Sequence, residues 1–250
     1  MTFPVDASIF SFFDSAQISW ATLGYILGGM GLTCLLIIGA MGLGLILGTA
    51  LASLQVYGPA WSAGLAGLYV WFFRGVPILV LMFLFHFGLA SQLEDLVRSL
   101  FGYRLRIPAL LSAVTVLGLC SAAYQSQIFR GAMKSIPAGQ FKAAKALGMS
   151  SFQAVRVIIL PQALRISIPA WSNEYSILLK DSAIAYVIGA AEIMARFKAV
   201  ASTSHQYLLM YILAGLVYYL ITWIGVKLLM SLYERVRIPG LAEVNATDTI

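Results

Sequence analysis

The sequence predicts an all-α polytopic membrane protein with five membrane-spanning helices, its N-terminus outside and its C-terminus inside. Of its 250 residues, 60% are hydrophobic and only 10% are charged. Soluble domains carry about 25% charged residues, and disordered chains are poor in apolar residues, so the composition argues against both classes. The apolar residues form continuous runs, whereas a membrane β-barrel has short segments of alternating polarity.

Five apolar runs are long enough to cross about 30 Å of hydrocarbon as helices. The first and third runs carry no charge, the second and fifth carry one each, and the fourth carries three. The second also contains Pro77, which should bend it because proline removes a helix hydrogen bond. The runs cover residues 24–50, 61–90, 107–129, 166–191 and 207–229.

The distribution of charge predicts the orientation. Residues 1–23 contain Asp6 and Asp14 but no Lys or Arg, so they lack the basic start of a signal peptide and should face outward. The window 130–165 carries six basic residues and no acidic one, which is typical of a cytoplasmic loop. An odd number of spans then leaves the C-terminus in the cytoplasm.

The segment 141–165 within this loop has a helical pattern of its own. Alanines favour a first short helix, Gly148 should break it, and a second amphipathic piece should end at Pro161. Two interpretations remain open on these grounds. The segment either anchors the loop at the membrane surface or is a docking element whose small residues let a partner approach closely.

This segment resembles the cytoplasmic loop of bacterial ATP-binding-cassette (ABC) importer permeases. The family pattern is Glu-Ala-Ala, a glycine after three residues, and later Ile-x-Leu-Pro. Further motifs in chain order resemble the branch that transports polar amino acids of the histidine, glutamine, arginine and opine type. The matching segments are 142–144 with Gly148, 158–161, 73–77, 123–132, 135–140, 169–174 and 179–182.

The resemblance implies the fold of a type I importer permease, with coupling helices between the third and fourth spans that contact an ATPase subunit. It implies an external segment 1–23, a transmembrane permease domain 24–232 with its coupling loop at 132–165, and a cytoplasmic tail 233–250. The residues it assigns to ATPase coupling are Lys142, Ala143, Ala144, Leu147, Gly148 and Pro161.

The implied partners are two copies of the ATPase, a second permease, an external solute-binding protein, the amino-acid substrate and the lipid bilayer of a bacterial inner membrane. No nucleic acid is implied. ATP and Mg²⁺ should bind the ATPase, since this sequence has no Gly-Lys dipeptide for a phosphate-binding loop. Two residues depart from the family pattern: Lys142 and Gln127 each replace a glutamate. Lys142 therefore favours a second permease that differs from this chain.

Ionisable residues within a membrane span are costly, so those of the fourth run are candidates for function. Glu174 is the strongest candidate because it can bind an ammonium group, and the neighbouring Asn173 can add hydrogen bonds. Asp181 lies seven residues on, on the same helical face. A structural alternative is an ion pair that links Arg74 or Lys180 to one of these carboxylates.

Three further residues are candidates for the translocation path. Arg74 can bind a substrate carboxylate bidentately or brace the break before Pro77. Gln125 and Gln127 can line the path from the third span or serve a structural role. The sequence contains no catalytic constellation, so we expect a transport subunit that is not itself an enzyme. The alternative function is a self-sufficient proton- or ion-coupled carrier or channel that uses Glu174 and Asp181.

Overall fold

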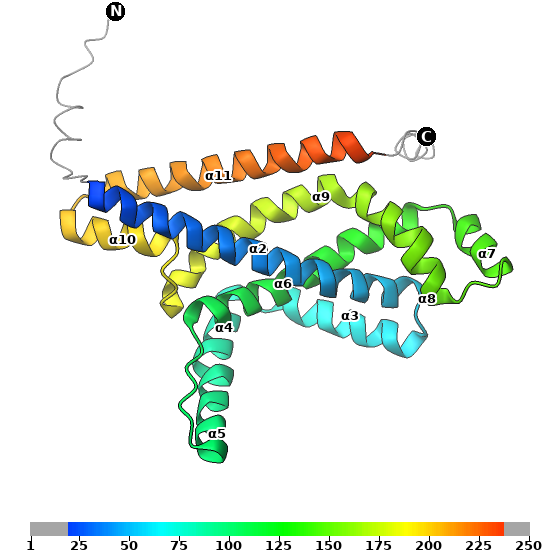
Figure 1. Cartoon of the computed structure of the whole chain (residues 1–250), viewed down its shortest axis with the longest axis horizontal. Helices are drawn as coiled ribbons and strands as arrows, with labels where there is room; N and C mark the ends of the chain where they lie inside the picture. Colours follow the sequence, from blue (N-terminus) through cyan, green and yellow to red (C-terminus); the bar gives the residue numbers. More distant parts are fainter. Residues whose placement is uncertain (1–19, 238–250) are drawn as a thin grey trace, which may run out of the picture.

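In a computed structural model of the chain, residues 20–237 are described, and they form helices joined by short connections (Figure 1). Five helical segments among them are long and apolar enough to cross a membrane, which confirms the predicted all-α polytopic fold. These segments are Thr22–Tyr57, Ile78–Phe101, Ala109–Ser135, Ser151–Ile188 and Tyr207–Val236. Most of the expected external segment 1–23 and of the tail 233–250 lies outside the described residues.

Helices α2 (Trp20–Tyr57) and α6 (Ala109–Ser135) form the central pair of the bundle. Glycines bring the two backbones close together. A Cβ atom on Gly48 would lie 3.2 Å from the carbonyl oxygen of Ala122, and one on Gly118 would lie 2.6 Å from Leu43 Cδ2. Larger residues at these positions would force the helices apart, as expected for membrane helices that pack through small residues.

The second apolar run forms two helices, not the single bent span predicted for residues 61–90. Helix α3 (Ala60–Gly75) packs against α2 and α6, and the helix is interrupted before α4 (Ile78–Phe83). The break follows from Pro77, which has no N–H to donate and which forces Val76 into an extended conformation.

Beyond the break, α4 continues through the π-helical η1 (Leu84–Ala90) into α5 (Ser91–Phe101). This continuous segment is the second span by length and composition, whereas the sequence prediction began that span at residue 61. The segment projects as an arm from the rest of the bundle, and residues 102–108 run back along it (Figure 1).

The loop after α6 forms two short helical pieces. Helix α7 (Ala138–Ala146) ends in a turn at Gly148, which has φ of +83°, and α8 (Ser151–Ala154) begins with a capping box from Ser150 and Gln153. The chain then continues through the π-helical η2 (Val155–Ile159) into α9 (Leu160–Asp181). The prediction of a helix end at Pro161 is therefore wrong. Pro161 lies inside a continuous helical segment, directly after the π-helical turn η2, where the regular hydrogen-bond ladder is already interrupted.

The opposite end of the bundle is closed by α10 (Ile193–Ser204), which follows the 3₁₀ helix η3 (Ser182–Ile188) and packs against α2 and α11 (Tyr207–Val236). The fully buried Glu192 carboxylate caps α10 by accepting hydrogen bonds from the amides of Met194 and Ala195, and it also accepts one from Tyr218 at 2.6 Å. Burial raises the pKa of the Glu192 carboxyl, and these three hydrogen bonds oppose the rise. Helices α7 and α8 lie at one end of the bundle and α10 at the other (Figure 1).

Candidate functional site

A cavity of about 430 Å³ lies where the break between α3 and α4 faces the middle of α6 and α9. Arg74, Glu174 and Asp181 bring three charges of both signs to its wall. A zwitterion or a cationic amino acid offers the complementary charges. The complete lining is Phe73, Arg74, Gly75, Val76, Pro77, Ile78, Cys120, Ser121, Tyr124, Glu174, Ile177, Leu178 and Asp181.

The Glu174 carboxylate is buried and held by a chain of hydrogen bonds between α9 and α6. Its Oε1 accepts a bond of 2.7 Å from Ser121 Oγ, which itself accepts one of 3.0 Å from Gln125 Nε2. Trp171 Nε1 donates to Gln125 Oε1 at 2.7 Å and completes the chain. A carboxylate has about four acceptor positions, so Glu174 keeps capacity for a ligand in the cavity.

Arg74 makes a cation–π contact and no ion pair within the described residues. Its guanidinium carbon lies 5.0 Å from the centre of the Tyr124 ring. Within residues 20–237, one ion pair is closer than 4.0 Å, and it joins Arg237 to Glu234. The internal ion pair considered for Arg74 or Lys180 is thus absent from this part of the chain. Both cavity carboxylates and the guanidinium remain without a charged partner at that distance.

The other predicted site residues lie in different surroundings. Asn173 is exposed on α9 and does not line the cavity. Gln125 is fully buried and reaches Glu174 only through Ser121. Gln127 points elsewhere, since its Nε2 donates to Gln55 Oε1 on α2 at 3.0 Å.

Sequence reasoning missed two polar side chains of the cavity, Ser121 and Tyr124. A signal for Ser121 existed, because it precedes Gln125 by four residues and therefore shares its face of α6. Tyr124 is part of the Ala-Tyr motif, but its position in that motif does not indicate the direction of its side chain.

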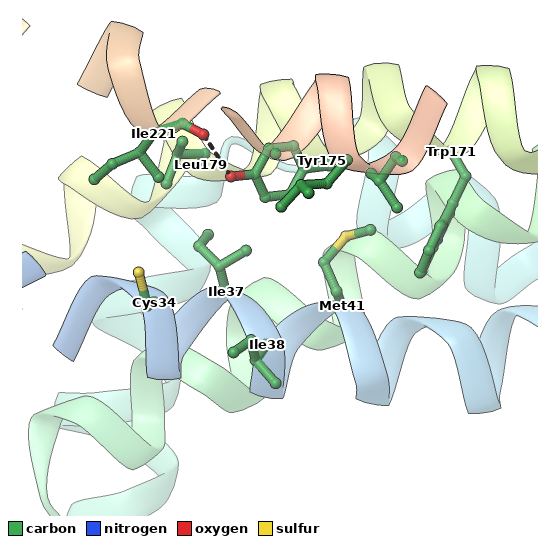
Figure 2. A pocket seen from close by; sticks show the side chains of 11 residues that line it. Cys34, Ile37, Ile38, Met41, Trp171, Tyr175, Leu179 and Ile221 are labelled. Atoms are coloured by element: carbon green, nitrogen blue, oxygen red, sulfur yellow. Dashed lines mark hydrogen bonds between the residues drawn. The ribbon is translucent and has the colours of Figure 1, made fainter. Parts of the chain in front are cut away.

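A second cavity, of about 320 Å³, is apolar (Figure 2). It lies between α2, α9 and α11, and Figure 2 shows Ile37, Met41 and Trp171 around it. Its one phenol, on Tyr175, donates a hydrogen bond of 3.0 Å to the carbonyl of Ile221. An amino acid would lose its hydration here without gaining polar partners, so this cavity does not suit a polar ligand.

The segment from α7 to η2 carries exposed side chains that are both apolar and basic. Leu147 is 83% exposed, Phe152 71% and Val157 61%. We call this the docking surface, and it consists of Lys142, Lys145, Leu147, Phe152, Arg156 and Val157. Ala143 and Gly148 are exposed beside it, whereas Ala144 is buried and holds α7 in place.

Two contacts connect the docking surface to the bundle. The ring of Phe141 on α7 stacks on Tyr57 at the end of α2, with a centroid distance of 4.7 Å. Gln162 Nε2 on α9 donates to Gln140 Oε1 on α7 at 2.7 Å. The second contact joins α7 to the helix that carries Glu174 and Asp181.

The comparison with protein families decides the identity of this arrangement. The model of the family described as binding-protein-dependent transport system inner membrane component matches residues 40–237. The chain belongs to this family. The resemblance stated from the sequence motifs is confirmed, and the chain is a multi-pass membrane permease.

Curated relatives of this permease agree in size and sequence. The probable amino-acid permease protein YxeN of Bacillus subtilis is 41% identical over 68% of this chain and 72% of its own. The octopine transport system permease protein OccM of Rhizobium radiobacter is 35% identical over 86% and 87%. The histidine/lysine/arginine/ornithine transport system permease protein HisM of Salmonella typhimurium is 32% identical over 90% and 94%.

Solved structures support the fold of the permease. An amino acid ABC transporter crystallised with histidines matches with a TM-score of 0.71 and 29% identity, covering 94% of this chain and all of that chain. The methionine transporter MetNI matches with a TM-score of 0.61 at 19% identity, which shows a shared fold alone. The predicted type I permease architecture is confirmed.

Proposed function

We propose that this chain is one permease subunit of an ATP-driven importer in a bacterial inner membrane, and that its substrates are polar amino acids, basic ones above all, or their conjugates. The single observation that carries the substrate class is the cavity with Glu174, Asp181 and Arg74 in its wall. The names of the relatives, which include histidine, lysine, arginine, ornithine and octopine systems, point to the same class.

In this proposal, Glu174 binds the cationic group of the substrate and Arg74 binds its carboxylate through a bidentate hydrogen bond. Ser121 and Gln125 position the Glu174 carboxylate: Ser121 donates to it directly, and Gln125 orients Ser121. Asn173 and Gln127 lie outside the cavity lining, and we assign Asn173 to the exposed face of α9 that a second permease would cover.

Coupling to ATP occurs through the docking surface. Two ATPase subunits bind ATP and Mg²⁺. Each of them contacts one permease at residues 142–148 and the adjoining α8. Closure of the ATPase pair displaces α7, and the contact between Gln140 and Gln162 passes that displacement to α9. An external solute-binding protein delivers the substrate at the end of the bundle that bears α10. The domain division into residues 1–23, 24–232 and 233–250 belongs to the same proposal.

Lys142 supports a second permease of different sequence. The family pattern has a glutamate at this position, and a reversed charge changes which ATPase residues can face it. A second permease with the standard glutamate would give the two ATPase subunits two different contacts.

Reconstitution tests the function. The permease, its ATPase, its second permease and its binding protein are placed in liposomes with labelled arginine outside and ATP on the ATPase side. We expect uptake that requires ATP and the binding protein. Uptake that proceeds without the ATPase and follows the membrane potential would refute the importer and favour the ion-coupled carrier.

A further inference from the structure

A third pocket, of about 310 Å³, lies away from the charged cavity, where the ends of α2 and α6 next to the α7 loop meet α3. Its lining combines polar and apolar residues. Gln55, Gln127 and Arg130 are joined by hydrogen bonds, and α3 contributes Ala63, Gly67, Val70 and Trp71.

Among the described residues that line this pocket, Arg130 holds the only charge. One of its terminal nitrogens, Nη1, donates to Gln127 Oε1 at 3.2 Å. Its Nε is buried and has no hydrogen-bond partner. A buried donor on a guanidinium without a partner is costly, so this atom indicates a missing acceptor.

The residue beside Arg130 explains why the charge is uncompensated. Gln127 Oε1 is the acceptor that faces Arg130 Nη1, and a carboxylate in its place would form an ion pair with the guanidinium. The neutral Gln127 supplies an acceptor but no negative charge. Its own Nε2 is bonded to Gln55 Oε1 at 3.0 Å, which leaves the amide NH₂ of Gln55 as a further donor near the guanidinium.

The ligand must then be an anion with several acceptor oxygens and an apolar part. A guanidinium edge binds two oxygens of a phosphate side by side. Trp71 is 75% exposed and lies about 17 Å along the helix axis from Ala60, the first residue of α3. Basic pockets between membrane helices next to a polybasic cytoplasmic loop are typical sites for anionic lipid headgroups.

We propose that Arg130, Gln127 and Gln55 bind the phosphate group of an anionic phospholipid, whose acyl chain lies along Val70 and Trp71. The phosphate supplies the negative charge that Gln127 lacks. This site shares no lining residue with the substrate cavity.

The test uses the full permease, purified in detergent with its partner subunits. Binding of dihexanoyl phosphatidylglycerol is titrated by thermophoresis, with dihexanoyl phosphatidylcholine and inorganic phosphate as comparison ligands. Arg130→Gln removes the charge, and Gln127→Glu supplies an internal counter-ion at almost unchanged volume. Lys134→Gln is the matched control, because Lys134 is exposed one turn further along α6 and does not line the pocket.

We expect phosphatidylglycerol to bind about tenfold more weakly to both pocket variants and unchanged to Lys134→Gln. Inorganic phosphate that binds as tightly as the lipid, with the same loss in both variants, would support the anion site and assign it to free phosphate. Equal binding to all variants would overturn the proposal. So would altered permease pairing in the two pocket variants with unchanged lipid binding, since Arg130 would then face a protein carboxylate. Gln127→Glu loses the hydrogen bonds that Gln127 Nε2 donates to Gln55 and Ser126, but its carboxylate can still accept from Arg130. Its lipid titration therefore tests the proposal even if Arg130→Gln fails to fold.

Discussion

Replacement of Glu174 by glutamine tests the substrate site most sharply. Glutamine has nearly the same volume and keeps an oxygen that can accept the 2.7 Å hydrogen bond from Ser121, so the contact between α6 and α9 survives. The variant removes only the negative charge. It therefore separates recognition of a cation from the integrity of the bundle.

The size of the effect follows from the burial of this group. Glu174 is 4% exposed, so water screens its charge poorly. At an effective dielectric constant of about 20, opposite charges 4 Å apart attract by about 4 kcal/mol before desolvation is subtracted. Charge-assisted hydrogen bonds retain about 1.5–3 kcal/mol net, which corresponds to a roughly ten- to hundredfold increase in the KM for a cationic substrate.

The assay measures uptake of labelled arginine into liposomes that contain the complete transporter, over a range of substrate concentrations. ATP hydrolysis stimulated by the binding protein should persist, because the docking surface is untouched. Asp95→Asn is the control, since it also removes one carboxylate but lies exposed on α5. An unchanged KM for Glu174→Gln would refute the assignment of Glu174 to the substrate.

Three further predictions concern coupling and stability. Gly148 has φ of +83° and open space around it, so Gly148→Val should strain the turn by about 1–2 kcal/mol and lower the ratio of uptake to ATP hydrolysis. Gly139→Ala in the same loop should leave this ratio unchanged. An unchanged ratio in Gly148→Val would argue against a coupling turn. Lys142→Glu should weaken ATPase binding in pull-down titrations by about tenfold at low salt and less at high salt, and tighter binding would show that the facing surface is basic. Glu192→Ala removes the cap of α10 and the acceptor of the Tyr218 hydroxyl, so thermal unfolding should show a free energy of unfolding lower by about 1–3 kcal/mol. A decrease no larger than that caused by Asp95→Ala would contradict the capping role.

The composition and the long apolar runs were sufficient to predict the helical membrane fold, because each span satisfies its own backbone hydrogen bonds. The predictions failed at prolines. Pro77 separates two helices, whereas Pro161 lies inside a continuous helical segment next to the π-helical η2, and both outcomes depend on the residues around the ring. A run of apolar residues does not distinguish a single bent span from two helices that pack at an angle.

The charged residues of the site were predictable, but their connections were not. Glu174 was found from its cost in a membrane, and Arg74 from its place before the break. The chain from Trp171 through Gln125 and Ser121 to Glu174 joins residues up to 53 positions apart, and it depends on the crossing of α6 and α9. The partners of Gln127 likewise became evident only when α2 was placed beside α6.

Cross-linking tests whether the docking surface contacts an ATPase subunit on the cytoplasmic side of the membrane. Leu147→Cys places a thiol on the docking surface, where the native side chain is 83% exposed. With the native background of Cys34 and Cys120 as control, a short bifunctional maleimide added to inverted membrane vesicles should join position 147 to the ATPase subunit. A thiol at 147 that reacts only from the outer face of intact cells, or that never forms a link to an ATPase, would contradict the account.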